Sequence, residues 1–104
     1  MVQLRGQMTL RPASEGGLPE ALPDGSRSLL FRLAELGTTA PDSFGAVVRR
    51  ADSAALEPGS TFEVRVLPWA EGVEALVSAG DRLPVWHGRD VGVLEVAAVD
   101  VPAE

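Results

Sequence analysis

Hydrophobic and polar residues alternate along much of this chain, and a period of two is typical of β-strands that bury one face. The alternation predicts strands in residues 2–10, in residues 29–33, around residues 46–48 and in residues 62–66. In the last of these, Phe62 and Val64 share a face with Val66, whereas Glu63 and Arg65 point outward. The strands therefore each present an apolar side to a common interior.

Residues 80–96 predict a β-hairpin. Two short strands flank the turn His87-Gly88-Arg89-Asp90, in which glycine allows the chain to reverse. If Leu83 and Val85 face inward, Trp86 points outward.

Residues 91–99 predict a last strand whose phase is ambiguous. Leu94 and Val96 fall on one face, whereas Val91 falls on the other. A β-bulge inserts one extra residue and shifts the alternation, so we expect Gly92 to mark a bulge.

Glycine and proline separate the predicted strands. Residues 11–27 are a loop rich in both, and Pro58-Gly59 predicts a tight turn. Residues 69–79 are the one place where a helical turn fits, because their valines and leucine have helical spacing. About six short strands joined by such turns favour an all-β fold, either a small antiparallel barrel or a sandwich.

Composition sets limits on the chemistry. A chain of 104 residues with 45% hydrophobic residues predicts one domain, residues 1–104. There is no cysteine, so disulfides and thiolate metal sites are excluded. The pattern contains no signal peptide and no apolar run of membrane-spanning length, and we expect a cytoplasmic protein without membrane contact.

The net charge is −6, from 15 acidic and 9 basic residues, and every basic residue is arginine. The acidic residues are dispersed along the sequence. Binding to a phosphate backbone requires clustered cations, so nucleic acid is not the expected partner.

No set of residues predicts a catalytic site, a cofactor site or a metal site. His87 is the sole histidine, and a zinc site needs further nitrogen or sulfur ligands. Ser26 or Ser28 could be combined with His87 into a triad, but neither serine lies in a G-x-S-x-G turn. We therefore expect a protein that is not an enzyme.

Short glycine-containing motifs occur in a fixed order. They are Glu15-Gly16-Gly17, Gly25-x-Arg27, Asp42-x-x-Gly45, Pro58-Gly59, Gly80-x-Arg82 and Arg89-x-Val91-Gly92. Their order and spacing resemble the carboxy-terminal β-barrel, domain III, of elongation factor Tu and related translational GTPases, over about residues 7–99. The resemblance implies a small six-stranded antiparallel closed barrel with Greek-key-like connections.

The chain departs from that family in ways that bear on function. It has no G-x-x-x-x-G-K-[ST] loop and no lysine, so we expect no GTP binding. In the family the barrel also contacts tRNA, and Leu29, Phe44 and Trp69 stand where the family carries polar or basic groups that face the RNA. Together with the negative charge, these apolar residues argue against tRNA as the partner.

The apolar replacements predict a non-enzymatic interaction module, a stand-alone barrel that binds another protein or a second copy of itself. Trp69, Trp86 and Phe44 are the predicted anchors, with Phe44 adding to an apolar patch that includes Leu29 or Leu30. Large exposed aromatic residues are typical of interface hot spots.

Arg27 and Arg89 are the predicted polar contacts at the rim of that patch. Gly88 precedes Arg89 in the turn that keeps the family's character.

Two alternative functions stay open. One is binding to tRNA or a ribosomal component, through Arg27, Arg49, Arg50, Arg82 and Arg89. The other is a small enzyme that uses Glu15, Asp24 or His87.

Overall fold

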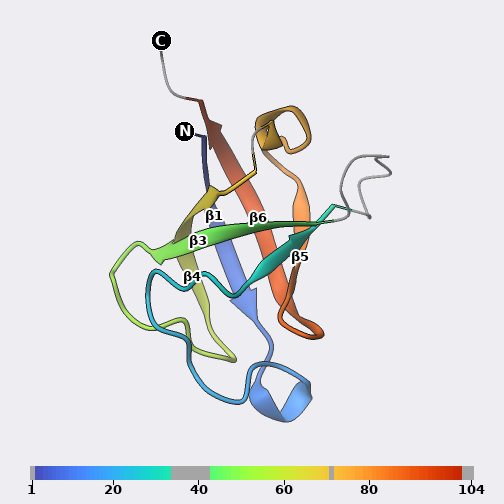
Figure 1. Ribbon diagram of the computed structural model, residues 1–104. Coiled ribbons are helices and arrows are strands. Elements are labelled where there is room, and N and C mark those ends of the chain that lie inside the picture. The colour runs from blue at the N-terminus through green and yellow to red at the C-terminus, as the bar shows by residue number, and fades with distance from the viewer. Residues whose placement is uncertain (1, 34–42, 71, 102–104) are drawn as a thin grey trace.

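Six antiparallel strands close into a barrel in the computed structural model, which describes residues 2–33, 43–70 and 72–101 (Figure 1). The strands are β1 (Gln3–Leu10), β2 (Leu30–Arg32), β3 (Ser43–Arg50), β4 (Thr61–Pro68), β5 (Arg82–Trp86) and β6 (Asp90–Asp100). Among the described residues, two single-turn 3-10 helices, η1 (Ala13–Glu15) and η3 (Val73–Ala75), lie at opposite ends of the barrel (Figure 1). The predicted all-β class and the closed six-stranded barrel are confirmed.

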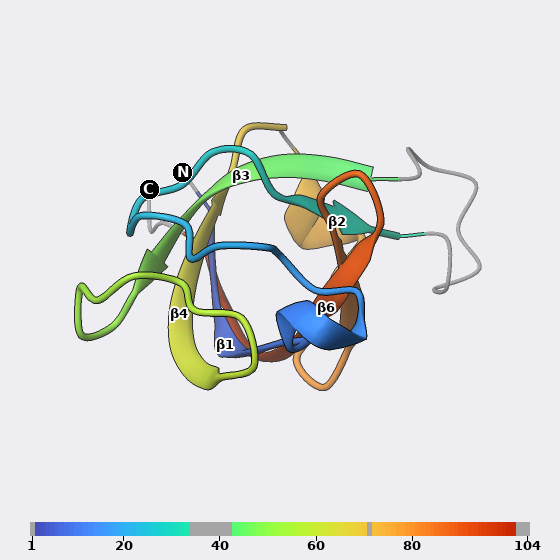
Figure 2. The same cartoon turned by 90° about the horizontal axis from the view of Figure 1, so that it is seen from below.

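The strand order around the barrel is β1-β4-β3-β2-β5-β6. Strands β2, β3 and β4 are successive neighbours, and β1 lies beside β4. This is the Greek-key arrangement, followed from β4 back to β1 against the direction of the chain. Figure 2 shows the strands placed around a common interior. Closure leaves β2, with three residues, between the longer strands β3 and β5.

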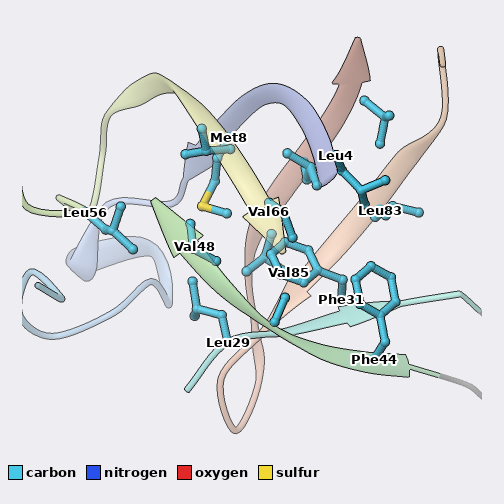
Figure 3. Packing of buried hydrophobic residues seen from close by; sticks show 14 of the residues in the cluster. Leu4, Met8, Leu29, Phe31, Phe44, Val48, Leu56, Val66, Leu83 and Val85 are labelled. Atoms are coloured by element: carbon cyan, nitrogen blue, oxygen red, sulfur yellow. The ribbon is translucent and has the colours of Figure 1, made fainter. Parts of the chain in front are cut away.

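The interior is filled by the side chains that the alternation assigned to it. Leu4, Met8, Val66, Leu83 and Val85 are all fully buried (Figure 3). Side chains of this kind contribute about 1.5–3 kcal/mol each when buried. Their burial therefore supplies most of the driving force for closure of the barrel.

β6 contains two bulges, of which the sequence indicated one. Val85 pairs with Gly92 and Trp86 with Asp90, so Val91 is the extra residue, next to the predicted position. The second shift is against β1, between Arg5 and Gly6. Each bulge increases the local twist, which helps a small sheet to close.

The helical turn expected in residues 69–79 is present as η3 alone, in which Val73 is buried, and Val77 shortly after it is buried as well. The strand expected around residues 46–48 is longer and spans Ser43–Arg50. Asp42 of the family-like motifs lies outside the described residues. Within the described ranges, no helix combines the length and the hydropathy needed to cross a membrane.

Candidate binding face

The structure divides the predicted anchors into buried and exposed residues. Phe44 is 4% exposed and its ring stacks on that of Phe31, with 5.4 Å between the ring centroids (Figure 3). Leu29 is fully buried as well. The prediction that Phe44 and Leu29 contribute to a surface patch is therefore wrong, because both side chains point into the barrel and belong to its core.

Trp69 is exposed, and it lies against the outer wall of the barrel. The side chain is 57% exposed, and its backbone N–H donates to the carbonyl oxygen of Gly45 at 3.1 Å. A Cβ atom at Gly45 would lie 2.8 Å from Cε3 and Cζ3 of the indole, which is closer than carbon atoms pack. Gly45 thus provides the space in which the indole rests.

Leu30 connects the two tryptophans. It pairs with Gly45 on β3 and with Trp86 on β5, so its side chain lies on the outer surface between them. Leu30 is 38% exposed. Directly paired residues on one face of a sheet are in contact distance. Trp69, Leu30 and Trp86 therefore form one continuous row, which we call the tryptophan row.

A second apolar pair extends this row along β3 and β4. Val47 pairs with Leu67, and both side chains occupy outward positions and are half-buried. Val47 is two residues beyond Gly45 on the same face of β3. The apolar surface is consequently two rows wide at β3.

Arginines surround this apolar surface. The Arg32 guanidinium carbon lies 4.9 Å from the ring centroid of Trp86, a cation–π contact that covers part of the indole. Arg89 follows in the turn after Trp86, in which the His87 N–H donates to the Arg89 carbonyl oxygen at 2.9 Å. At the other side, Arg49 pairs with Arg65, next to Val47 and Leu67.

Arg27 completes this set. The neighbouring Ser26 forms an antiparallel bridge with Val48, which brings the exposed Arg27 alongside the outer face of β3 near Val47. We refer to Arg27, Arg32, Arg49, Arg65 and Arg89 as the arginine border. In the described part of the chain, none of the five has a carboxylate partner within 4.0 Å, whereas Arg5, Arg11 and Arg50 each do.

Charge is unequally distributed among the strands. The adjacent strands β5, β2 and β3 contain arginines but no aspartate or glutamate, although the chain has 15 acidic residues. Strands β4 and β6 carry Glu63, Asp90, Glu95 and Asp100. The three strands that carry most of the tryptophan row thus contribute arginines and no carboxylate of their own, whereas Asp90 on β6 lies opposite Trp86 and is paired with Arg11.

Three arginines lie in directly opposed positions on neighbouring strands. Arg65 pairs with Arg49 on one side and with Arg5 on the other, and like charges in directly opposed positions are destabilising. Arg5 is relieved by Asp100, whose Oδ2 atom lies 2.6 Å from Arg5 Nε and raises the arginine's pKa. Arg49 and Arg65 have no such carboxylate partner among the described residues.

The residues considered for catalysis have structural contacts or stand in exposed turns. Asp24 accepts a hydrogen bond from the backbone N–H of Arg50 at 2.6 Å, and the hydroxyls of Ser26 and Ser28 lie 3.1 Å apart. His87 is exposed in the β5–β6 turn. In the described residues, no three His, Asp or Glu side chains converge in a way that could hold a metal ion.

Shallow depressions lie beside the tryptophan row and away from it. One is lined by residues of β1, β4 and β6, including Arg65 of the arginine border together with Glu63 and Glu95, and another contains the Arg11–Asp90 pair. Neither includes a residue of the tryptophan row. Their charged side chains are solvated and of mixed sign, so they offer weaker recognition features than the aromatic surface.

Sequence reasoning missed several residues of the face. Gly45 was noted only as part of a glycine motif, and Val47, Leu67 and Arg32 were not predicted to belong to a binding face, although alternation along β3 and β4 places Gly45, Val47 and Leu67 outward. Their grouping depends on which strands are neighbours in the barrel, and a single strand's pattern contains no such information.

Comparisons with known proteins do not place the chain in a family. No protein-family model matches the chain, and a search of curated proteins found no match.

Proposed function

We propose that this chain is a cytoplasmic protein-interaction module, not an enzyme, and that it binds its partner through the tryptophan row. The observation that carries the proposal is Trp69, an indole 57% exposed and seated on Gly45 in line with Leu30 and Trp86. Exposing this much contiguous apolar surface to water is unfavourable and is typical of sites that a partner covers.

The composition of the row also supports binding. Tryptophan and arginine are enriched among interface hot spots, where truncation commonly costs about 2 kcal/mol or more. Both occur here, on strands held rigid by a closed barrel. A preorganised surface loses little conformational entropy on binding.

We also propose that the barrel is related to domain III of elongation factor Tu. The ordered glycine motifs support this relationship, and so does the closed six-stranded barrel, which is the fold that the resemblance implies. A role in GTP hydrolysis is not part of the proposal.

Affinity capture with matched variants tests the proposed function. Wild-type chain, Trp69→Ser and Val101→Ser are immobilised, and proteins retained from a lysate of the source organism are quantified by mass spectrometry. Val101 is 62% exposed and lies outside the tryptophan row, so it controls for the loss of an exposed apolar side chain. We expect proteins that are retained by wild type and Val101→Ser but lost on Trp69→Ser.

Light scattering of the same three proteins tests self-association. A dimer that dissociates on Trp69→Ser supports the row as an interface between copies. If neither capture nor self-association depends on Trp69, the proposed function is wrong.

A second candidate, RNA binding, is favoured by the arginine border next to the exposed Trp69 and the half-buried Trp86, because bases stack on aromatic rings beside cations. Salt-sensitive binding of a single-stranded RNA that is lost on Trp69→Ser would support it.

A further inference from the structure

We propose that the partner is an acidic amphipathic segment of another protein, with apolar residues that cover the tryptophan row and carboxylates that bind the arginine border. This inference rests on the proposed function and specifies the chemistry of the ligand. The inference rests on the positive charges that surround the row. The apolar residues of the row alone would not specify an acidic partner.

The apolar part of the face fixes the spacing of the partner's apolar residues. The row crosses β5, β2 and β3, and two strand spacings amount to about 10 Å. Residues i and i+7 of an α-helix are separated by about the same distance, so a helix with apolar residues at i, i+4 and i+7 would cover the row. Val47 and Leu67 widen the surface enough to receive a side chain of such a helix.

The border determines the partner's charge. Five of the nine arginines surround the row, and β5, β2 and β3 carry no acidic residue. Asp90, which lies opposite Trp86 on β6, is paired with Arg11. A segment with carboxylates on either side of its apolar residues would provide the missing counter-charges. Such complementarity raises the association rate and excludes basic competitors.

Arg32 is positioned to bind a carboxylate of the partner. Its guanidinium stacks over Trp86 at 4.9 Å, which restricts the side chain before any partner binds. A stacked guanidinium keeps its N–H groups at the edge of its plane, where they can form paired hydrogen bonds with a carboxylate. The contact with Trp86 thus joins the apolar and the charged parts of the face.

Two other occupants fit the charges less well. A two-fold dimer through this face would place the same border on both copies, and Arg49 and Arg65 would approach further arginines. RNA would find cations here, but it would also meet the aliphatic side chains of Leu30 and Val47, which offer neither a stacking surface nor hydrogen bonds to the bases.

Selection from a displayed library of random peptides tests the proposal. Peptides retained by immobilised wild type are screened for loss of binding to Trp69→Ser, which identifies those that occupy the row. We expect these peptides to be enriched in Asp and Glu around two or three apolar residues, relative to the unselected library. One such peptide is then synthesised with a fluorophore and its affinity is measured by anisotropy.

Charge reversal provides the matched comparison. Arg32→Glu combined with Arg49→Glu is expected to raise the dissociation constant of the peptide about tenfold or more. Arg82→Glu is expected to raise it by less than about twofold. Arg82 is exposed and outward on β5, but it does not border Val47 or Leu67, and it lies directly opposite the carboxylate-bearing Glu95 on β6. Raising the salt to about 1 M, where the screening length is about 3 Å, should weaken wild-type binding as well. If the double variant does not fold, Arg49→Glu alone replaces it, because this side chain is exposed.

Each remaining outcome overturns the inference in a recognisable way. Row-dependent peptides without an excess of acidic residues refute the acidic partner but leave the proposed function intact. Row-dependent dimerisation, or row-dependent binding of a single-stranded RNA oligonucleotide in preference to the peptides, shows a different occupant. Failure to recover any peptide that depends on Trp69 refutes both the inference and the proposed function.

Discussion

The indole of Trp69 rests on the backbone of Gly45, at a point where a Cβ atom would come within 2.8 Å of the ring. Gly45 does not have a positive φ, so an L-amino acid can adopt its backbone conformation. The absence of a side chain at this position therefore serves the placement of the tryptophan.

Gly45→Ala should displace Trp69 and weaken partner binding without unfolding the barrel. The added methyl group overlaps the ring, and the exposed indole can swing toward solvent, so we expect the free energy of unfolding to change by less than about 1 kcal/mol. In a Trp86→Phe background Trp69 is the sole tryptophan, since the chain has two. Adding Gly45→Ala to this background should shift the fluorescence of Trp69 to longer wavelength, because the displaced indole is more exposed to water. An unchanged spectrum would show that the indole does not depend on Gly45.

Phe44→Ala should destabilise the barrel strongly, in contrast to Trp69→Ser. Phe44 is 4% exposed and stacked on Phe31, and removal of a buried aromatic ring costs about 3–5 kcal/mol. Trp69→Ser removes a largely exposed ring and should cost about 1 kcal/mol or less. Urea unfolding of the two variants measures both values, and similar losses would contradict the assignment of Phe44 to the core.

The error over Phe44 shows which sequence arguments are reliable. Alternation placed Phe62 inside and Glu63 outside correctly, because the period of a strand is a local property of the chain. Phe44 was assigned to the surface through the family resemblance, and the strand was expected to begin near residue 46. With the observed start at Ser43, the same alternation places Phe44 inward with Ala46 and Val48.

The binding face could be predicted only in part, for a different physical reason. Trp86 and Trp69 were expected to be exposed, and Leu30 was named as one of two possible neighbours. Their assembly into one row depends on β2 lying between β3 and β5, a pairing of segments distant in sequence. The second bulge in β6, against Arg5 and Gly6, was missed because it is imposed by the neighbouring strand β1.

Gly6→Ala should destabilise the fold through a backbone clash. A Cβ atom at Gly6 would overlap the carbonyl oxygen of Glu95, and main-chain atoms of a paired strand cannot move aside as a side chain can. We expect a loss of about 1–3 kcal/mol or more in the free energy of unfolding, as for overpacked cores.

Gly72→Ala is the control for Gly6→Ala. Gly72 has a φ of 83° and no atom within 4 Å of the added Cβ, so its replacement adds backbone strain of about 1–2 kcal/mol but no clash. Thermal unfolding followed by circular dichroism compares the two. A Gly6→Ala variant as stable as wild type would show that β1 and β6 do not pack as closely as the bulge requires.

Asp52 should titrate below its ordinary pKa of 3.8. The backbone N–H of Ala54 donates to Asp52 Oδ1 at 3.1 Å, and this hydrogen bond is the main cause of the lowered pKa. The positive charge of Arg50 adds to it, since Arg50 Nε lies 2.7 Å from Oδ1, although this N–H is poorly aligned for a hydrogen bond. Both interactions favour the ionised carboxylate in the folded state.

The sign of the pH dependence follows from that direction. A carboxyl whose pKa is lower in the folded state stabilises the fold above its unfolded pKa, and this contribution is lost as the pH falls through the folded pKa. Carboxyl carbon shifts followed by NMR between about pH 2 and pH 6 measure the Asp52 pKa directly. Arg50→Ala should raise the pKa only part of the way to 3.8, because the Ala54 hydrogen bond remains. A full return to 3.8 would assign the effect to the arginine, and no change would remove Arg50 from the account of this loop.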